Sequence, residues 1–367
     1  MKNLLFVMMA SMAVPVAAQV SEEALRRFVE GYLPHAPGST TTVRIERSVN
    51  TGSGPYLVAT AVQRLAAGRQ QQVGLLVDPG TRTVTAGMVY PLPESNPPVT
   101  PATLQQFVES SVPQMLSSAL RSRVRVRWPV VPTRQTGVTA LTAAVSTGYG
   151  EVSMPIAVTA DGRTLALGNN WPLNRDPRAV RRELLQGAEL QTGAKFKEGA
   201  LLVAEFSDFQ CPACAAGWPH LRDAMAQFGD RVQYGMGNFP LIQSSPWSFR
   251  AAVAGICVEQ LDPGSYIDFK EEVYRIRGSM TLQTADELFR EFVVQRDLDV
   301  AKFDACYMKE PAINRVLRHM ELGHRMGVQG TPTYYAGGEQ LPFGDWDTIR
   351  SRLTAIVAAG GIPESAE

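Results

Sequence analysis

Hydrophobic and polar positions in the first half of the chain follow the same pattern twice. Residues 25–30 and 104–109 place apolar side chains at helical spacing. Alternating β-branched runs follow each segment, at 41–45 and 123–127, and further strand-like pieces are separated by Gly, Pro, Asp and Asn turns. Each unit is therefore predicted to be a helix followed by an antiparallel meander of about four strands, with the helix covering one side of the sheet.

The two patterns are interpreted as copies of one module. The helical segments lie 79 residues apart, and Gly87 to Leu92 is echoed 81 residues later by Gly168 to Leu173. Helix, strands and a Pro-Leu ending recur in the same order, which favours an internal repeat over chance similarity. A Pro-rich joint at 91–101 separates the copies.

The second half has a different pattern. The apolar run 200–206 is typical of a buried central strand, and it leads directly to a pair of cysteines. A chain of 367 residues exceeds the usual size of one hydrophobic core, so several domains are expected. The predicted boundaries are 19–93 and 101–174 for the α+β repeats, 175–192 for a helical linker, and 193–367 for a C-terminal domain with a helical insertion at about 247–326.

The first residues resemble an export signal. Lys2 precedes an apolar run at 4–16, and Val16-Ala17-Ala18 fits a small-residue cleavage site, so 1–18 is predicted to be a signal peptide. The alternative, an uncleaved anchor, would need about 20 apolar residues. We expect a periplasmic or otherwise exported chain that is soluble after cleavage. Lys and Arg together number 35, as do Asp and Glu, so the charge balance gives no reason to expect a nucleic acid partner.

The paired cysteines have the spacing of a redox centre. The order strand, Cys211-Pro212-Ala213-Cys214, helix places Cys211 at a helix N-terminus, where Pro212 suits the first helical position. Free backbone N–H groups and the helix dipole there stabilise a thiolate, the nucleophilic form of cysteine. The alternative is half of a tetrahedral zinc site, but a second such pair and a paired histidine are both missing. We therefore expect neither metal nor cofactor beyond the Cys211–Cys214 disulfide.

Two distant motifs carry a resemblance to a known family. The segment 205–214 resembles the active-site segment of the DsbA-like branch of the thioredoxin superfamily, and 327–333 looks like that family's cis-proline loop, with Thr331 before Pro332. An ordinary trans turn is the alternative for this loop. The resemblance covers about 193–362 and implies an α/β thioredoxin fold, thiol-disulfide oxidoreductase activity, and an active-site dipeptide of Pro212 and Ala213.

The resemblance also implies a role for Glu205, six residues before Cys211. The superfamily keeps a buried acid beneath the disulfide, where it shuttles the proton of the second cysteine, here Cys214. The alternative is that Glu205 faces solvent at a strand end.

Two further cysteines, Cys257 and Cys306, lie 49 positions apart in the predicted helical insertion. We expect a structural disulfide that joins helices of the insertion. A second redox pair that relays electrons is the alternative.

The resemblance leaves the direction of exchange open. One hypothesis is an oxidase of cysteine-containing secreted or envelope proteins, reoxidised by a membrane redox partner. A DsbC- or DsbG-like isomerase or reductase is the alternative, with the N-terminal repeats placed like a dimerisation domain and a homodimer as its consequence. A third hypothesis is a client-binding or chaperone-like protein with a redox-regulating module. DsbA has Pro-His between its cysteines where this chain has Pro212-Ala213, so we expect a potential between those of DsbA and thioredoxin.

Overall fold

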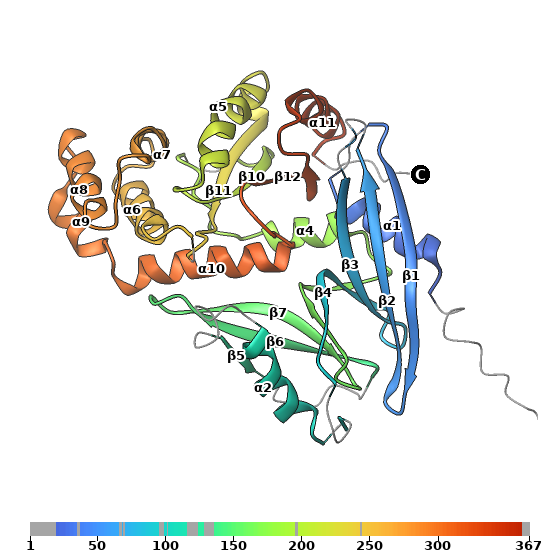
Figure 1. Cartoon of the computed structure of the whole chain (residues 1–367). Coiled ribbons are helices and arrows are strands. Elements are labelled where there is room, and N and C mark those ends of the chain that lie inside the picture. Colours follow the sequence, from blue (N-terminus) through green and yellow to red (C-terminus); the bar gives the residue numbers. More distant parts are fainter. Residues whose placement is uncertain are drawn as a thin grey trace, which may run out of the picture.

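The N-terminal half folds into one continuous antiparallel sheet whose strands come from both repeats (Figure 1). The computed structural model describes residues 20–361 except 35–36, 66–67, 69, 95–98, 101, 116–123, 128–135, 195–196 and 243. The predicted signal peptide at 1–18 and the last six residues of the predicted C-terminal domain therefore lie outside the described residues.

Each repeat contributes one described helix and a meander of strands. The first repeat contains α1 (Glu22–Tyr32), β1 (Thr40–Thr51), β2 (Gly54–Arg64), β3 (Gln70–Asp78) and β4 (Thr83–Pro91). The second contains α2 (Leu104–Met115), β5 (Val124–Arg127), β6 (Val138–Ser146), β7 (Glu151–Thr159), β8 (Thr164–Leu167) and β9 (Asn170–Pro172). The strand order is β1-β2-β3-β4-β8-β7-β6-β5, with β9 also pairing with β4.

The helices bury amphipathic faces on this sheet, as their sequence pattern predicts. Ser21 caps α1 by accepting a hydrogen bond from the backbone N–H of Ala24. Leu25, Phe28 and Val29 follow at helical spacing and are buried against strands of the first repeat. Val108 of α2 is buried in the same way against strands of the second repeat.

The two repeats meet at a local twofold arrangement. Tyr90 of β4 pairs with Leu165 of β8. Trp171 of the second repeat is equivalent to Tyr90, and Val84 of the first repeat is equivalent to Leu165. Trp171 of β9 also pairs with Val84 of β4. Both pairings are antiparallel, so the joint between the repeats is an approximate internal dyad that places them in one sheet within a single chain.

The C-terminal half contains a small sheet of order β11-β10-β12-β13, surrounded by helices (Figure 1). Strand β10 is parallel to β11 and antiparallel to β12. The elements are α4 (Pro177–Leu185), β10 (Leu201–Ser207), α5 (Pro212–Ala226), β11 (Val232–Asn238), α6 (Ser248–Leu261), α7 (Ser265–Ile276), α8 (Ala285–Gln295), α9 (Val300–Cys306), α10 (Glu310–Met326), β12 (Thr333–Ala336), β13 (Glu339–Leu341) and α11 (Trp346–Ala358), with a short 3-10 turn at Gly229–Arg231. The predicted fold class, an α/β thioredoxin domain with a helical insertion after two α+β repeats, is confirmed. None of the helices in the described ranges is long and apolar enough to span a bilayer.

A buried arginine on α4 joins the two halves. Arg181 is completely buried and donates hydrogen bonds to the carbonyl oxygens of Gly31 and Tyr32 at the end of α1. It also donates to the carbonyl of Met326 at the end of α10. Its guanidinium lies 4.9 to 5.4 Å from the ring centroids of Tyr32, Trp171 and Tyr335. The N-terminal module is therefore attached to the segment that leads into the predicted cis-proline loop.

Candidate active site

The two active-site cysteines lie where β10 passes into α5. Cys211 is the N-cap residue of α5 and Pro212 occupies its first turn. The backbone N–H of Cys214 donates to the Cys211 sulfur over 3.3 Å. Cys211 is partly exposed, whereas Cys214 is buried, and both are thiols in this structure. An incoming sulfur can therefore reach Cys211 but not Cys214.

The surroundings separate the acidities of the two thiols. The pKa of Cys211 is lowered from 9.0 to about 6, first by the hydrogen bond with the Cys214 side chain, with Thr331 and the backbone N–H groups of Cys214 and Ala213 adding to the effect. The pKa of Cys214 is raised, first by burial, and then by Cys211 and the charge of Glu205. Cys211 is thus suited to be the nucleophile, and Cys214 keeps its proton until exchange requires it.

The second motif lies against Cys211 in space although it is more than 100 residues away in sequence. The Thr331–Pro332 peptide bond is cis. The Cys211 sulfur lies 3.5 Å from the carbonyl oxygen of Thr331. The Thr333 hydroxyl donates to the carbonyl of Gly330 and fastens the loop to the start of β12. The loop therefore forms one wall of the site beside the accessible sulfur.

Glu205 lies on β10 with its side chain fully buried, so the alternative of a solvent-facing strand end does not hold. Its Oε2 accepts from the ammonium of Lys270 over 2.6 Å and from the hydroxyl of Tyr234 over 2.5 Å. Its Oε1 makes no hydrogen bond with any described residue. Glu205 therefore keeps one free oxygen near Cys214, whose pKa its charge helps to raise.

Lys270 supplies the positive charge beneath the site. It comes from α7 in the helical insertion and is fully buried. Its ammonium lies 3.7 Å from the ring centroid of Trp218 and also hydrogen-bonds the hydroxyl of Tyr234. Burial lowers the pKa of Lys270, and the attraction of Glu205 opposes that effect. The ion pair places two opposite charges in an otherwise apolar interior.

No sequence pattern pointed to Lys270, Tyr234 or Trp218 as site residues. Each lies on a different element, and no motif links them to Cys211 in the sequence. Lys270 stands among three acids and three aromatic residues in the sequence of α7, where a lysine would ordinarily be assigned to the solvated face of a helix. Only the packing of α7 against α5 and β11 brings it to Glu205.

Cys257 and Cys306 form a disulfide that joins α6 to α9, with their Cα atoms 5.8 Å apart. Cys257 is buried in the main core, and Cys306 lies near the amide oxygen of Gln260. The two cysteines are bonded to each other and lie in the insertion, while Cys211 and Cys214 are at the start of α5.

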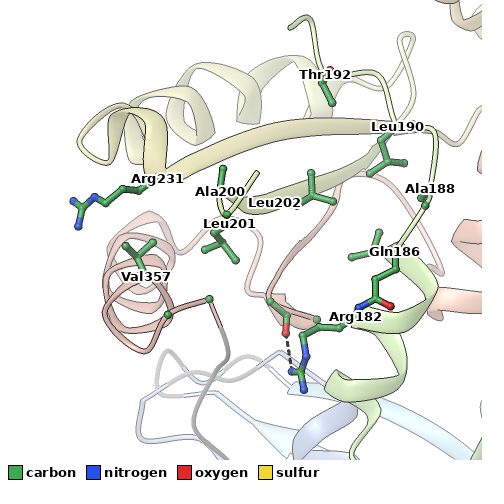
Figure 2. Close-up of a pocket in the computed structure, with 17 residues that line it drawn as sticks. Arg182, Gln186, Ala188, Leu190, Thr192, Ala200, Leu201, Leu202, Arg231 and Val357 are labelled. Atoms are coloured by element: carbon green, nitrogen blue, oxygen red, sulfur yellow. Dashed lines mark hydrogen bonds between the residues drawn. The ribbon is translucent and has the colours of Figure 1, made fainter. Parts of the chain in front are cut away.

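A separate cavity lies at the linker end of the C-terminal sheet. It holds about 800 Å³ and is lined by the end of α4, the start of β10 and the end of α11. Figure 2 shows Leu201, Leu202 and Val357 beside it, with Arg182 hydrogen-bonded to the carbonyl of Gly337. The described residues that line it include no thiol, imidazole or carboxylate. In the described ranges, no three His, Cys, Asp or Glu side chains meet in a metal-binding arrangement.

Comparisons with known proteins find similarity over part of the chain. Residues 197–355 match the thioredoxin family model described as "Thioredoxin". A "Probable disulfide bond formation protein D" of Bacillus anthracis is 28% identical over 159 residues, which cover 41% of this chain and 71% of that protein. A Na(+)/H(+) antiporter NhaA 1 of Mycobacterium sp. (strain KMS) is 25% identical over 165 residues, covering 44% of this chain and 25% of the antiporter. The crystal structure of oxidised BdbD from Bacillus subtilis aligns with a TM-score of 0.41 and 22% identity over 47% of this chain and 95% of that one.

Proposed function

We propose that this chain, a DsbA-like member of the thioredoxin superfamily and a thiol-disulfide oxidoreductase, donates its Cys211–Cys214 disulfide to cysteine-containing proteins outside the cytoplasm. The observation that carries the proposal is the difference in pKa between the thiols of Cys211 and Cys214. The pKa of Cys211 is about 6 and that of Cys214 is raised. Because a stabilised thiolate favours the reduced pair, the disulfide is correspondingly a good oxidant.

In the proposed reaction, a client thiolate attacks the Cys211 sulfur of the disulfide. The Cys211–Cys214 bond breaks, a mixed disulfide forms, and Cys214 leaves and takes up a proton. A second client thiolate then attacks the client sulfur of the mixed disulfide and expels Cys211 as a thiolate. The client gains one disulfide, and its two electrons remain on the reduced Cys211–Cys214 pair. A membrane redox partner would reoxidise the pair for the next cycle.

We propose Glu205 as the group that gives and takes the proton of Cys214. Cys214 is buried, so bulk water cannot exchange its proton directly. The free Oε1 of Glu205 can accept that proton, and Lys270 and Tyr234 hold the opposite oxygen in place. The ammonium of Lys270 compensates the charge of the Glu205 carboxylate, so this group can act as a base although it is buried.

Export is part of the same proposal. The predicted signal peptide at 1–18 supports it, and so does the disulfide between Cys257 and Cys306, because such bonds persist in oxidising compartments. Clients would be secreted or envelope proteins that arrive with reduced cysteines.

The alternative is a disulfide isomerase or reductase. The observation in its favour is the N-terminal module, which is placed like a dimerisation domain. In such a protein the module would form a dimer. Here the two repeats already pair with each other through β4, β8 and β9 inside one chain. This internal pairing uses the edge that a single repeat would offer to a partner, and it favours a monomeric oxidase.

The experiment that tests the proposal is mixed-disulfide trapping in the host with Cys214→Ala, which leaves Cys211 to hold its client. A variant with Cys211→Ala and Cys214→Ala is the matched control. Recovery of many multi-cysteine exported proteins supports a general disulfide donor, whereas one recurring partner indicates a dedicated role. In vitro, the oxidised chain should convert reduced ribonuclease to its disulfide form. If only the reduced chain reactivates scrambled ribonuclease, the isomerase alternative replaces the proposal.

A further inference from the structure

Two surface notches lie at equivalent positions of the two repeats. In the first repeat β4 leaves β3 and continues along β8, and in the second repeat the chain leaves β7 after β8 and continues as β9 along β4, so the sheet opens beside each crossing. The first-repeat notch is lined by Val58, Ala59, Thr60, Gln72, Gly74, Met88 and Val89, among others. The second-repeat notch is lined at the matching positions by Ala140, Leu141, Thr142, Ser153, Pro155, Asn169 and Asn170.

A helix of the same chain packs against the second-repeat notch and narrows it. Glu321 and Arg325 of α10 form part of its lining. The Oε1 of Glu321 accepts from the backbone N–H of Ser153 over 2.9 Å, and the side-chain amide of Asn169 donates to the carbonyl of Arg325 over 3.0 Å. Figure 1 shows α10 and α2 on opposite sides of β7. One turn of helix, with an acid and a base four residues apart, therefore forms one wall of this notch.

Among the residues that the structure describes, no helix lines the equivalent first-repeat notch. It holds about 620 Å³, compared with about 350 Å³ beside α10. Met88 occupies the position equivalent to Asn169. Its side chain is 49% exposed, and among the described large apolar side chains only Val294 is more exposed. Gln72 occupies the position equivalent to Ser153. The pairing of β3 with β4 ends at Gly74 and Gly87, so Gln72 lies beyond it. The notch thus presents an apolar side chain beside strand backbone that β4 does not pair.

Charges of both signs border the first-repeat notch. Arg47 of β1 reaches across to the hydroxyl of Thr164, and Glu46 accepts from the hydroxyl of Thr60. A helix that carries an acid and a base one turn apart, as α10 does with Glu321 and Arg325, matches this pair of charges. Met88 can adapt its unbranched side chain to an apolar residue on such a helix.

We infer that the first-repeat notch is a docking site for an amphipathic helix of another protein, seated as α10 is seated in the second repeat. The partner helix places a carboxylate at the backbone N–H of Gln72, a base toward Glu46, and an apolar residue on Met88. The duplication thus gives one notch to the chain's own redox domain and leaves the other for a partner. This inference does not depend on the direction of disulfide exchange.

The test uses a fluorescently labelled peptide with the sequence of α10, Glu310–Met326, and the full oxidised chain. The peptide contains no cysteine, so it cannot bind through disulfide exchange. The covalently attached α10 holds the second-repeat notch at high effective concentration, so the free peptide reports on the first. We expect saturable binding in fluorescence anisotropy, weakened at least about tenfold by Met88→Glu, because the new carboxylate would lose its water beneath the bound helix and the apolar contact would be lost.

Two controls make the outcome decisive. Val294→Glu adds the same charge at an exposed site on α8 and should leave binding unchanged. A peptide with Glu321→Ala should bind more weakly to the unmodified chain. Insulin reduction should be the same for both chain variants, because neither residue contacts the cysteines. The inference is overturned if the unmodified chain shows no saturable binding up to about 1 mM peptide, or if Met88→Glu binds like Val294→Glu.

Discussion

Lys270 and Glu205 form a buried ion pair directly beneath the redox cysteines, with 2.6 Å between Nζ and Oε2 and neither side chain exposed. The pair joins the helical insertion to the central strand of the redox domain. A lysine on α7 and an acid on β10 thus connect an apparently peripheral insertion to the chemistry of Cys214.

Lys270→Met should lower the free energy of unfolding by about 3–5 kcal/mol, because it leaves the Glu205 carboxylate buried without a countercharge. Chemical denaturation of both proteins measures the difference. The double variant Lys270→Met with Glu205→Gln should recover most of the loss, since no charge is then left unpaired. Equal stability of the single and double variants would show that the two residues are not coupled.

Glu205→Gln should slow the resolution of a mixed disulfide by about 100-fold, because an amide cannot take or return the proton of Cys214. Stopped-flow measurement with a peptide disulfide follows this step. The pH profile of Cys211 alkylation should stay unchanged, since Glu205 is not among the groups that lower the pKa of Cys211. A resolution rate equal to that of the unmodified chain would remove Glu205 from the proposed proton path.

Alkylation of the reduced chain by iodoacetamide should rise with pH to half its maximum near pH 6, the pKa of Cys211. Because this pKa is lowered from 9.0, the folded reduced chain gains stability as the pH rises from about 6 to 9 and loses it again as the pH falls through 6. Thermal unfolding of the reduced and oxidised forms across this range measures the effect. A midpoint near pH 9 would contradict the assignment of Cys211 as the nucleophile.

Arg181→Met should destabilise the chain by about 3 kcal/mol, because three buried carbonyl groups lose their donor. It should also speed hydrogen exchange of the backbone amides at 327–329, just after Met326. Mass-spectrometric hydrogen exchange would detect this loosening. Arg181→Lys should have an intermediate effect, since one ammonium cannot reproduce the planar guanidinium. Unchanged exchange at 327–329 would mean that the N-terminal module does not support the cis-proline loop.

Gly87→Ala should separate the two repeats. A Cβ at position 87 would lie 2.0 Å from the carbonyl oxygen of Leu167, and the backbone of both strands would have to move. We expect a loss of several kcal/mol, at the upper end for single substitutions, in chemical denaturation. Gly52→Ala is the matched control in a turn of the same sheet, where no atom lies within 4 Å of the added carbon.

The sequence alone determined the features that depend on local order. Helix and strand periodicity predicted both repeats, because an amphipathic helix and an alternating strand each need only one buried face. Cys211-Pro212-Ala213-Cys214 predicted a helix start with an activated sulfur, since the first turn of a helix provides its own free N–H groups. The spacing of Gly87 and Gly168 revealed the duplication, but not that these two glycines meet in one sheet.

Tertiary structure decided everything that depends on distant segments meeting. Lys270 became the partner of Glu205, and Arg181 became the joint between the halves, only through packing, because burial of a charged side chain depends on which elements cover it. The notch of the first repeat likewise differs from its counterpart because α10 packs against the second repeat and not against the first. A sequence records which side chains are present, while the free energy of a buried charge or an unpaired strand edge is set by neighbours far away along the chain.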